Sequence, residues 1–306
     1  MTPIDANTAL YPSTQYGRAA PHIPVLLSAT LHYLSPQKGD SYLDLTAGYG
    51  GHAEAVLERT LQPARATLID RDQAAANHLR RRFESSGARI INNDFLSASR
   101  QLLAQKAAFN LILADLGASS PQFDEAGRGF SFLKDGPLDM RMDNRQQRTA
   151  ETVVNSYSRP RLEEVIRRYG QEPGAGAIAS AIVASRPITR TTQLATIVAQ
   201  SWRKRGRIHP ATRTFQALRI EVNDELKQLA EALPVWLDLL APAGRLVVIS
   251  FHSLEDRIVK RFFQDHSGGY DAKLTVLTKK PIKGSARDNV YNPRARSAKL
   301  RAAAKK

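Results

Sequence analysis

A glycine-rich segment follows directly after a short apolar stretch of the sequence. Residues 44–52 read DLTAGYGGH and contain three glycines, Gly48, Gly50 and Gly51. Glycine permits tight turns with positive φ, and it lets a ligand approach the backbone closely. A helix that begins near His52 would add free backbone N–H groups and the positive end of its dipole. The segment therefore predicts a binding site for a molecule that carries a negative group.

Acidic residues stand at the ends of four predicted strands. Asp44, Asp70, Asp94 and Asp115 each follow a short apolar run. In an open parallel sheet the carboxyl ends of the strands share one edge, and ligands bind there at the point where the strand order reverses. We expect the four acids to surround one pocket, in which Asp70 accepts both hydroxyls of a ribose. The alternative for each acid is an N-cap of the following helix, a position that Asp often occupies.

The glycine spacing fits two nucleotide cofactors. Gly48, Gly50 and Ala53 satisfy the G-x-G-x-x-G/A pattern of dinucleotide-binding loops. S-adenosylmethionine carries an ammonium and a sulfonium beside a single carboxylate, so a site of acids and glycines together suits it. The pyrophosphate of NAD would be repelled by the same acids. Asp115 is placed to accept an amino hydrogen of a substrate or to orient the cofactor, and we expect it to be the catalytic residue.

The elements that must position these residues alternate between strands and helices. Strands are predicted over 41–45, 64–70, 88–94 and 109–117, with helices over 52–60, 72–86 and 95–105 between them. This spacing is typical of an α/β fold, a parallel sheet with helices on both faces. The alternation resumes later with a helix near 213–240, a strand over 244–250, a helix over 253–264 and a strand near 273–278.

The 306 residues divide into three predicted parts. Residues 1–21 form a flexible N-terminal tail, and residues 22–136 and 212–306 form a discontinuous core that ends in a basic C-terminal tail. Residues 137–211 form a helical insert, which we expect to bind RNA. Basic residues concentrate in the last two parts: residues 159–213 hold 11 Lys or Arg and 3 Asp or Glu, and residues 279–306 hold 10 basic residues and one acid.

Composition narrows the classes of function. The chain holds 44 Lys and Arg against 29 Asp and Glu, a net charge of +15, which favours a polyanionic partner. The absence of cysteine excludes disulfides, Cys-type zinc sites and thiol nucleophiles. No secretory signal and no apolar run of about 20 residues are present, so we expect a cytoplasmic protein with no membrane partner. The number of subunits is left open.

Residues 250–263, SFHSLEDRIVKRFF, contain a histidine beside a serine and two acids. A hydrolase would need a G-x-S-x-G elbow around the serine, and none is present. Ser253 is better placed as a helix N-cap, with Asp256 completing a capping box. His252, Glu255 and Asp256 could hold a metal ion, but their spacing matches no common site. We therefore expect no metal.

Five separated blocks of the sequence resemble, in the same order, one bacterial family. The blocks are the glycine loop and residues 115–142, 209–220, 250–263 and 292–301. They are similar to the ribosomal RNA small subunit methyltransferase H family, also called MraW, over about residues 22–301. The sequence departs from the family pattern at Tyr49, and again at 173–176, where one proline and two glycines weaken helix formation.

The resemblance implies a class I, Rossmann-like S-adenosylmethionine-dependent methyltransferase sheet with an inserted small helical domain. It implies methyl transfer to the exocyclic N4 of a cytidine in 16S rRNA, at the P site of the decoding centre in the small ribosomal subunit. In the family the cofactor is contacted at the positions that match Gly50, Gly51, His52, Asp70, Phe95, Asp115 and Gln122.

Two other classes of function stay open on the sequence. The first is an NAD-dependent dehydrogenase on the same sheet, against which the acids at the strand ends count. The second is a non-catalytic RNA-binding or ribosome assembly factor that keeps the fold alone, against which the intact glycine loop counts. Cofactor titration separates the first alternative, and a methyl-transfer assay on ribosomal subunits separates the second.

Overall fold

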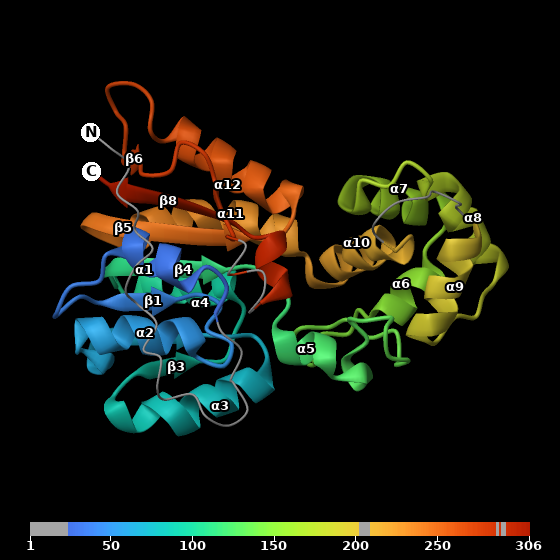
Figure 1. The fold of residues 1–306 in the computed structure, drawn as a ribbon, viewed down its shortest axis with the longest axis horizontal. Helices are drawn as coiled ribbons and strands as arrows, with labels where there is room; N and C mark the ends of the chain where they lie inside the picture. The colour runs from blue at the N-terminus through green and yellow to red at the C-terminus, as the bar shows by residue number, and fades with distance from the viewer. Residues whose placement is uncertain (1–23, 202–208, 286–287, 289–291) are drawn as a thin grey trace.

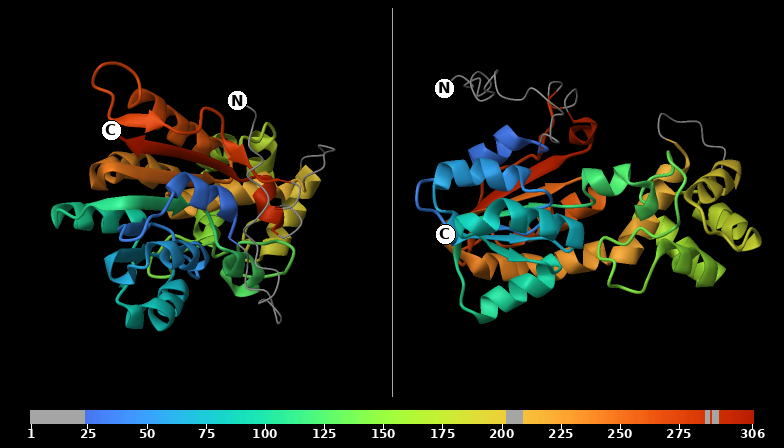
Figure 2. Two further views of the ribbon diagram at one scale, coloured as in Figure 1. Left: turned by 60° about the vertical axis from the view of Figure 1, so that its left-hand side comes forward. Right: turned by 90° about the horizontal axis from the view of Figure 1, so that it is seen from below.

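The computed structural model describes residues 24–201, 209–285, 288 and 292–306. A lobe built on one sheet lies beside a smaller helical lobe (Figure 1), and Figure 2 shows the two lobes from two further directions. Within these ranges every helix is too short or too polar to span a bilayer. The strands are β1 Tyr42–Asp44, β2 Ala66–Ile69, β3 Arg89–Ile91, β4 Phe109–Asp115, β5 Leu240–Ser250, β6 Leu274–Val276, β7 Ile282–Lys283 and β8 Lys299–Lys305.

The strands form one sheet in the order β3-β2-β1-β4-β5-β8-β6, with β7 paired to β8. The first five strands in this order are parallel, whereas β8 runs antiparallel to both β5 and β6. The order reverses between β1 and β4, so a crevice is expected beyond their carboxyl ends. The predicted α/β sheet is confirmed.

Helices cover both faces of the sheet, and side chains from alternate strand positions meet them. Tyr42 and Leu111 pack into one core with α1, α2 and α3, whereas Leu43 and Ile112 pack into the other with α4, α11 and α12. This alternation is the period of two that a strand imposes. The helices are α1 Leu27–Leu34, α2 Gly51–Thr60 and α3 Gln73–Phe83 on the first face, and α4 Phe95–Ala104, α11 Glu225–Leu239 and α12 Ser253–Asp265 on the second.

Strand β8 replaces part of the predicted basic tail. The segment Lys299–Lys305 lies inside the sheet, and Leu300, Ala302 and Ala303 are fully buried. Two of its basic residues pair with Asp256: Arg301 donates to it at 2.6 Å, and Lys299 donates to it at 3.4 Å. The expectation of a tail is therefore wrong for this segment. Its run of alanines has low strand propensity, so local sequence gave no sign of the strand.

The second lobe has its own core of buried aliphatic side chains from the insert. Phe215, Leu218 and Val222 of α10 belong to this core, so α10 is part of the insert. The predicted helix over 213–240 is two helices, because Asp224 adopts a left-handed φ of 50° between them. The insert therefore extends past the predicted boundary at 211. Its helices are α6 Ala150–Ser156, α7 Arg159–Gly170, α8 Ala175–Ala184, α9 Thr191–Ser201 and α10 Ala211–Asn223.

The departure from the family pattern near residue 173 does not abolish the helix there. Helix α8 begins at Ala175, directly after Pro173 and Gly174. A Cβ added to Gly176 would lie 3.3 Å from the carboxylate of Glu163 on α7. The glycine thus permits close packing of α7 against α8, which offsets its poor helix propensity.

The position of β8 generates a stability prediction. Replacing Ala302 by Asp places an unpaired charge at a fully buried site, so we expect a loss of about 3–5 kcal/mol in the free energy of unfolding. The control Ala177→Asp puts the same charge on an exposed position of α8 and should cost far less. Chemical denaturation of both variants measures the difference. Equal stability of the two would contradict the buried strand.

Candidate active site

A cavity of about 1000 Å³ opens at the carboxyl ends of the parallel strands. It lies where the strand order reverses, as the fold requires. Six of the seven residues predicted to bind the cofactor line this cavity: Gly51, His52, Asp70, Phe95, Asp115 and Gln122. Gly50 is not part of the lining. It starts α2 with a φ of 84°, and a Cβ there would collide with the ring of Phe83.

The glycine loop connects β1 to α2 and is held by a hydrogen bond to the side chain of Asp70. The N–H of Gly48 donates to Asp70 Oδ2 at 2.8 Å, and the N–H of Asp72 donates to Asp70 Oδ1 at 2.8 Å. The first turn of α2 presents backbone N–H groups that have no partner within the helix. A Cβ added to Gly51 would lie 2.7 Å from Pro24, so the loop approaches the segment before α1 closely.

The Asp70 carboxyl group is enclosed in the cavity wall. Burial raises its pKa to about 6, although the hydrogen bonds from Asp72 and Gly48 favour the charged form. The group is therefore an immobilised acceptor that loses its charge at mildly acidic pH. The role of Asp70 as the acceptor for the ribose hydroxyls stays a prediction.

Asp115 and His52 face each other across the cavity wall. His52 Nε2 lies 3.7 Å from Asp115 Oδ2, and the His52 side chain is 8% exposed. Among the described residues, neither ring nitrogen of His52 nor Asp115 Oδ1 has a hydrogen-bond partner. His52 and Asp115 therefore form a largely buried polar pair in the lining of the cavity.

The four acids do not form one ring around the cavity. Asp44 is buried beneath the loop and accepts from the Tyr42 hydroxyl at 2.7 Å, and burial raises its pKa to about 6. Asp94 is the N-cap of α4 and accepts from the N–H of Ser97 at 2.8 Å. Only Asp70 and Asp115 line the cavity. The expected ring of four is therefore wrong, and the N-cap alternative holds for Asp94.

Phe95 and Gln122 complete the wall from opposite sides. Phe95 packs edge-on against Trp236 with ring centroids 5.5 Å apart. Gln122 lies on α5, which spans Ser120–Asp124, and is 5% exposed. Its side chain donates to Asp72 Oδ2 at 2.8 Å, and its Oε1 accepts from the N–H of Ser119 at 3.0 Å. Both side chains are therefore held in place by the protein.

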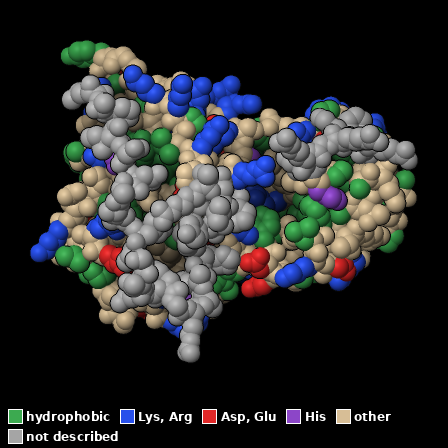
Figure 3. Space-filling model, in the orientation of Figure 1, with side chains coloured by type: hydrophobic (Ala, Val, Ile, Leu, Met, Phe, Trp, Pro, Cys, Tyr) green, Lys and Arg blue, Asp and Glu red, His purple; other side chains and the backbone are tan. Residues whose placement is uncertain are grey.

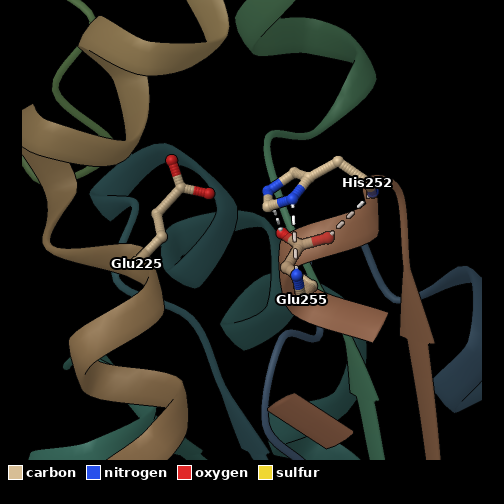
Figure 4. Close-up of side chains that lie close together, drawn as sticks. All are labelled: Glu225, His252 and Glu255. Atoms are coloured by element: carbon tan, nitrogen blue, oxygen red, sulfur yellow. Dashed lines mark hydrogen bonds and ion pairs between the residues drawn. The ribbon is translucent and has the colours of Figure 1, made fainter. Parts of the chain in front are cut away.

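A second group of charged residues lies at the end of β5 (Figure 4). Oxygen and nitrogen atoms of Glu225, His252 and Glu255 lie within 4.8 Å of one another. Arg219 holds Glu225 with two bonds of 2.8 and 2.9 Å. Glu255 accepts from the N–H of Phe251 at 2.8 Å and lies 3.0 Å from His252 Nε2. Each carboxylate thus has partners inside the protein. We infer that these residues hold the carboxyl end of β5 in position.

The charged group at the end of β5 corrects the predicted N-cap of α12, and it includes residues that the sequence did not indicate. The N-cap of α12 is His252, with Glu255 completing the capping box, rather than Ser253 with Asp256. Burial raises the pKa of Glu255, but His252 and Arg219 outweigh it and hold that pKa below its usual value. Arg219 and Glu225 come from the end of the insert and the start of α11, so no local pattern connects them to the site.

The strand order and the glycine loop beside the cavity match the fold of class I methyltransferases, which use S-adenosylmethionine. The chain belongs to the MraW methylase family, whose model matches residues 19–306. The predicted family and cofactor are confirmed, and membership favours methyl transfer over the dehydrogenase alternative.

Curated relatives match nearly the whole chain. A protein of Thermomicrobium roseum named ribosomal RNA small subunit methyltransferase H is 46% identical over 304 residues, covering 92% of this chain and 93% of the relative. A protein of Cyanothece sp. with the same name is 47% identical over 286 residues, covering 92% and 94%. A solved structure described as a putative rRNA-methylase from Clostridium thermocellum aligns with a TM-score of 0.46 at 11% identity, covering 93% of this chain and 99% of that chain.

The residues present fit the cofactor of this class. A cavity of about 1000 Å³ is large enough for a nucleoside with an amino acid attached. Asp70 offers an acceptor for hydroxyl groups, and the start of α2 offers donors for a carboxylate. His52 and Asp115 also line the cavity. A carboxylate in that space also suits a ligand with positive charge.

The raised pKa of Asp70 predicts that cofactor affinity and the stability of the free protein change in opposite directions with pH. Cofactor affinity should fall as the pH drops through about 6, because protonation removes an acceptor. The stability of the free protein should change the other way. A carboxyl whose folded pKa is raised contributes stability below its unfolded pKa of 3.8, and this contribution is lost as the pH rises through about 6. Asp44 adds to this second effect.

Calorimetry with S-adenosylmethionine and chemical denaturation between pH 5 and 8 measure the two trends. The variant Asp70→Asn serves as the control. It should bind the cofactor roughly ten- to a hundred-fold more weakly at neutral pH, because a charge-assisted hydrogen bond is lost. The cofactor affinity of this variant should also show no step near pH 6. A wild-type affinity that is flat across this range would remove Asp70 from the cofactor site.

Proposed function

We propose that this protein transfers a methyl group from S-adenosylmethionine to the exocyclic N4 of a cytidine in 16S rRNA, at the P site of the decoding centre. The names of the curated relatives support small-subunit rRNA as the substrate. The resemblance of the five sequence blocks to the family supports N4 of a cytidine in the decoding centre, and it leaves open whether free 16S rRNA or the assembled small subunit is the substrate.

The observation that carries this proposal is the place of Asp115, a carboxylate at the end of β4, in the lining of the cavity. Asp115 ends β4, beside the glycine loop, and its Oδ1 has no partner among the described residues. An exocyclic amine presents two hydrogens and a lone pair that is delocalised into the ring. A carboxylate that accepts one of these hydrogens orients the amine and supports the positive charge that develops on nitrogen.

The chain's own residues supply alignment. The cofactor brings a methyl group on a sulfonium, so the C–S bond that breaks already has a good leaving group. Asp70 and Gln122 hold one side of the site, and Asp115 holds the amine for in-line attack. As the N–C bond forms, N4 gains a positive charge and then loses a proton. Since that proton is acidic, the reaction does not require a strong base.

The target base must leave its stack to reach the cavity, as bases do in other enzymes that modify them. Phe130, which follows β4 and α5 in the chain, is 5% exposed and packs against Phe123. Phe132 packs against Phe215 of the insert with ring centroids 4.8 Å apart. Both rings therefore pack inside the protein. Other groups of the cavity wall must contact the target base.

The charge of the protein supports a nucleic-acid partner. Lys and Arg side chains gather near the junction of the two lobes in Figure 3. With a net charge of +15, contacts to phosphates would give affinity that falls with salt. Such contacts position RNA without reading its sequence, so specificity depends on whether a cytidine can enter the cavity.

Asp115→Asn tests the chemical role. We expect turnover to fall roughly ten- to a hundred-fold, because the amide keeps the shape and loses the charge. Binding to RNA should stay unchanged. Asp94→Asn is the matched control, since that side chain caps α4 outside the cavity. Single-turnover assays compare the two variants, and wild-type turnover in Asp115→Asn would limit the residue to a structural role.

The substrate prediction concerns context. Labelled methyl groups should appear on small subunits that lack the modification, at one cytidine of 16S rRNA. Duplex RNA of mixed sequence and DNA should bind at low salt without being methylated. Equal methylation of unrelated RNAs would contradict the proposed specificity. Absence of transfer to every small-subunit preparation would favour the alternative of a non-catalytic assembly factor.

A further inference from the structure

An arginine reaches the cavity from the segment that precedes β8. Arg294 lies on a 3-10 helix, Pro293–Arg296, and lines the cavity together with Ser120. Its guanidinium donates to the hydroxyl and to the carbonyl oxygen of Ser120, and it stacks over the ring of Phe123 at 4.7 Å. The side chain is therefore fixed by α5, the helix that follows Asp115 and the end of β4.

No carboxylate in the described part of the chain pairs directly with the charge of Arg294. Among the described residues, no carboxylate lies within 4.0 Å of its nitrogens. Burial lowers its pKa, and the more distant Asp124 and Asp115 only partly oppose this effect. An arginine has five N–H donors, and within the described part of the chain two of them go to Ser120. The remaining donors are available for an anion.

Other arginines of the cavity are already engaged on the cofactor side. Arg82 pairs with Glu54 and donates to the carbonyl oxygen of Tyr49 at 3.1 Å. Arg71 donates to Gln228 at 2.6 Å. Both belong to the segments that follow the β2 end. Arg294 is anchored instead to the segment that follows β4, where the target amine must meet Asp115.

The cavity must accommodate two anions when both substrates are bound. The carboxylate of S-adenosylmethionine has donors at the start of α2, as described above. A target nucleotide brings its own phosphates, which follow the base to the cavity. We infer that Arg294 binds a phosphate of the target nucleotide and so places the flipped base against Asp115. This inference rests on the proposed function for the identity of the base.

The geometry of arginine suits this task. A planar guanidinium presents paired donors that match two phosphate oxygens, and stacking on Phe123 fixes its plane. An ammonium in the same place would keep the charge and lose both features. A lysine at this position should therefore retain only part of the effect.

The first experiment measures binding without turnover, in the presence of S-adenosylhomocysteine. The probes are cytidine, cytidine 5′-monophosphate and cytidine 3′-monophosphate. We expect one monophosphate to bind the wild-type protein roughly ten-fold or more tightly than cytidine, as a charge-assisted hydrogen bond implies. Arg294→Met should abolish this preference, and Arg294→Lys should retain part of it. Cytidine and cofactor affinity should stay unchanged in both variants.

The second experiment uses the small ribosomal subunit. Arg294→Met should raise KM for the subunit more than it lowers kcat, and it should reduce the slope of log affinity against log salt by about 1. The matched control is Arg296→Met, two residues away on the same 3-10 helix and exposed. Its salt slope would change only if an exposed arginine served equally well, and that result would overturn the assignment.

The outcomes separate this inference from the proposed function. If Arg294→Met keeps the wild-type salt slope, or loses cofactor affinity and thermal stability together, Arg294 has a structural role and the inference is wrong. If the wild-type protein methylates a base other than cytidine, the proposed function fails. The salt slope on that RNA would then still decide whether Arg294 contacts a phosphate.

Discussion

Two hydrogen bonds to one carboxylate hold the site together. Asp70 accepts from the backbone of Gly48 in the glycine loop and of Asp72 at the start of α3. Asp72 in turn accepts from Gln122 and from Arg128 at 2.7 Å. One chain of contacts thus connects the loop after β1, the loop after β2 and α5. A substitution that removes the Asp70 carboxyl group would loosen all three segments at once.

The same chain extends to the helical insert. Arg128 donates to the carbonyl oxygen of Met142 at 3.3 Å, and the N–H of Met142 donates to Asn223 at 2.9 Å. Asn223 ends α10, and Arg219 on the same helix holds Glu225 beside the β5 end. The insert therefore contacts both sides of the cavity through fixed polar groups. A nucleic acid that binds the insert is positioned relative to the reacting atoms by these contacts.

The sequence predicted the parallel half of the sheet because each strand there is an apolar run between helices of ordinary length. It predicted Asp70 and Asp115 because parallel strands bring their ends together. It failed at Asp94, where a local cap and a ligand contact share one sequence pattern. It also failed at β8, whose pairing depends on neighbours far along the chain. The pairing of Arg219 with Glu225 was missed for a different reason: one helix was predicted over 213–240, and the break at Asp224 is what lets the two side chains meet.

The charges of the exterior and of the cavity help to explain how one protein accommodates both substrates. The protein carries an excess of positive charge overall, whereas Asp70 and Asp115 place carboxylates in the cavity beside the glycine loop. A polyanion is therefore attracted to the outside, and a cationic cofactor is attracted to this part of the cavity. The base itself is neutral, so the carboxylates of the cavity do not repel it. A phosphate drawn to the rim by an arginine leaves that base facing inward, where the acids select for an amine.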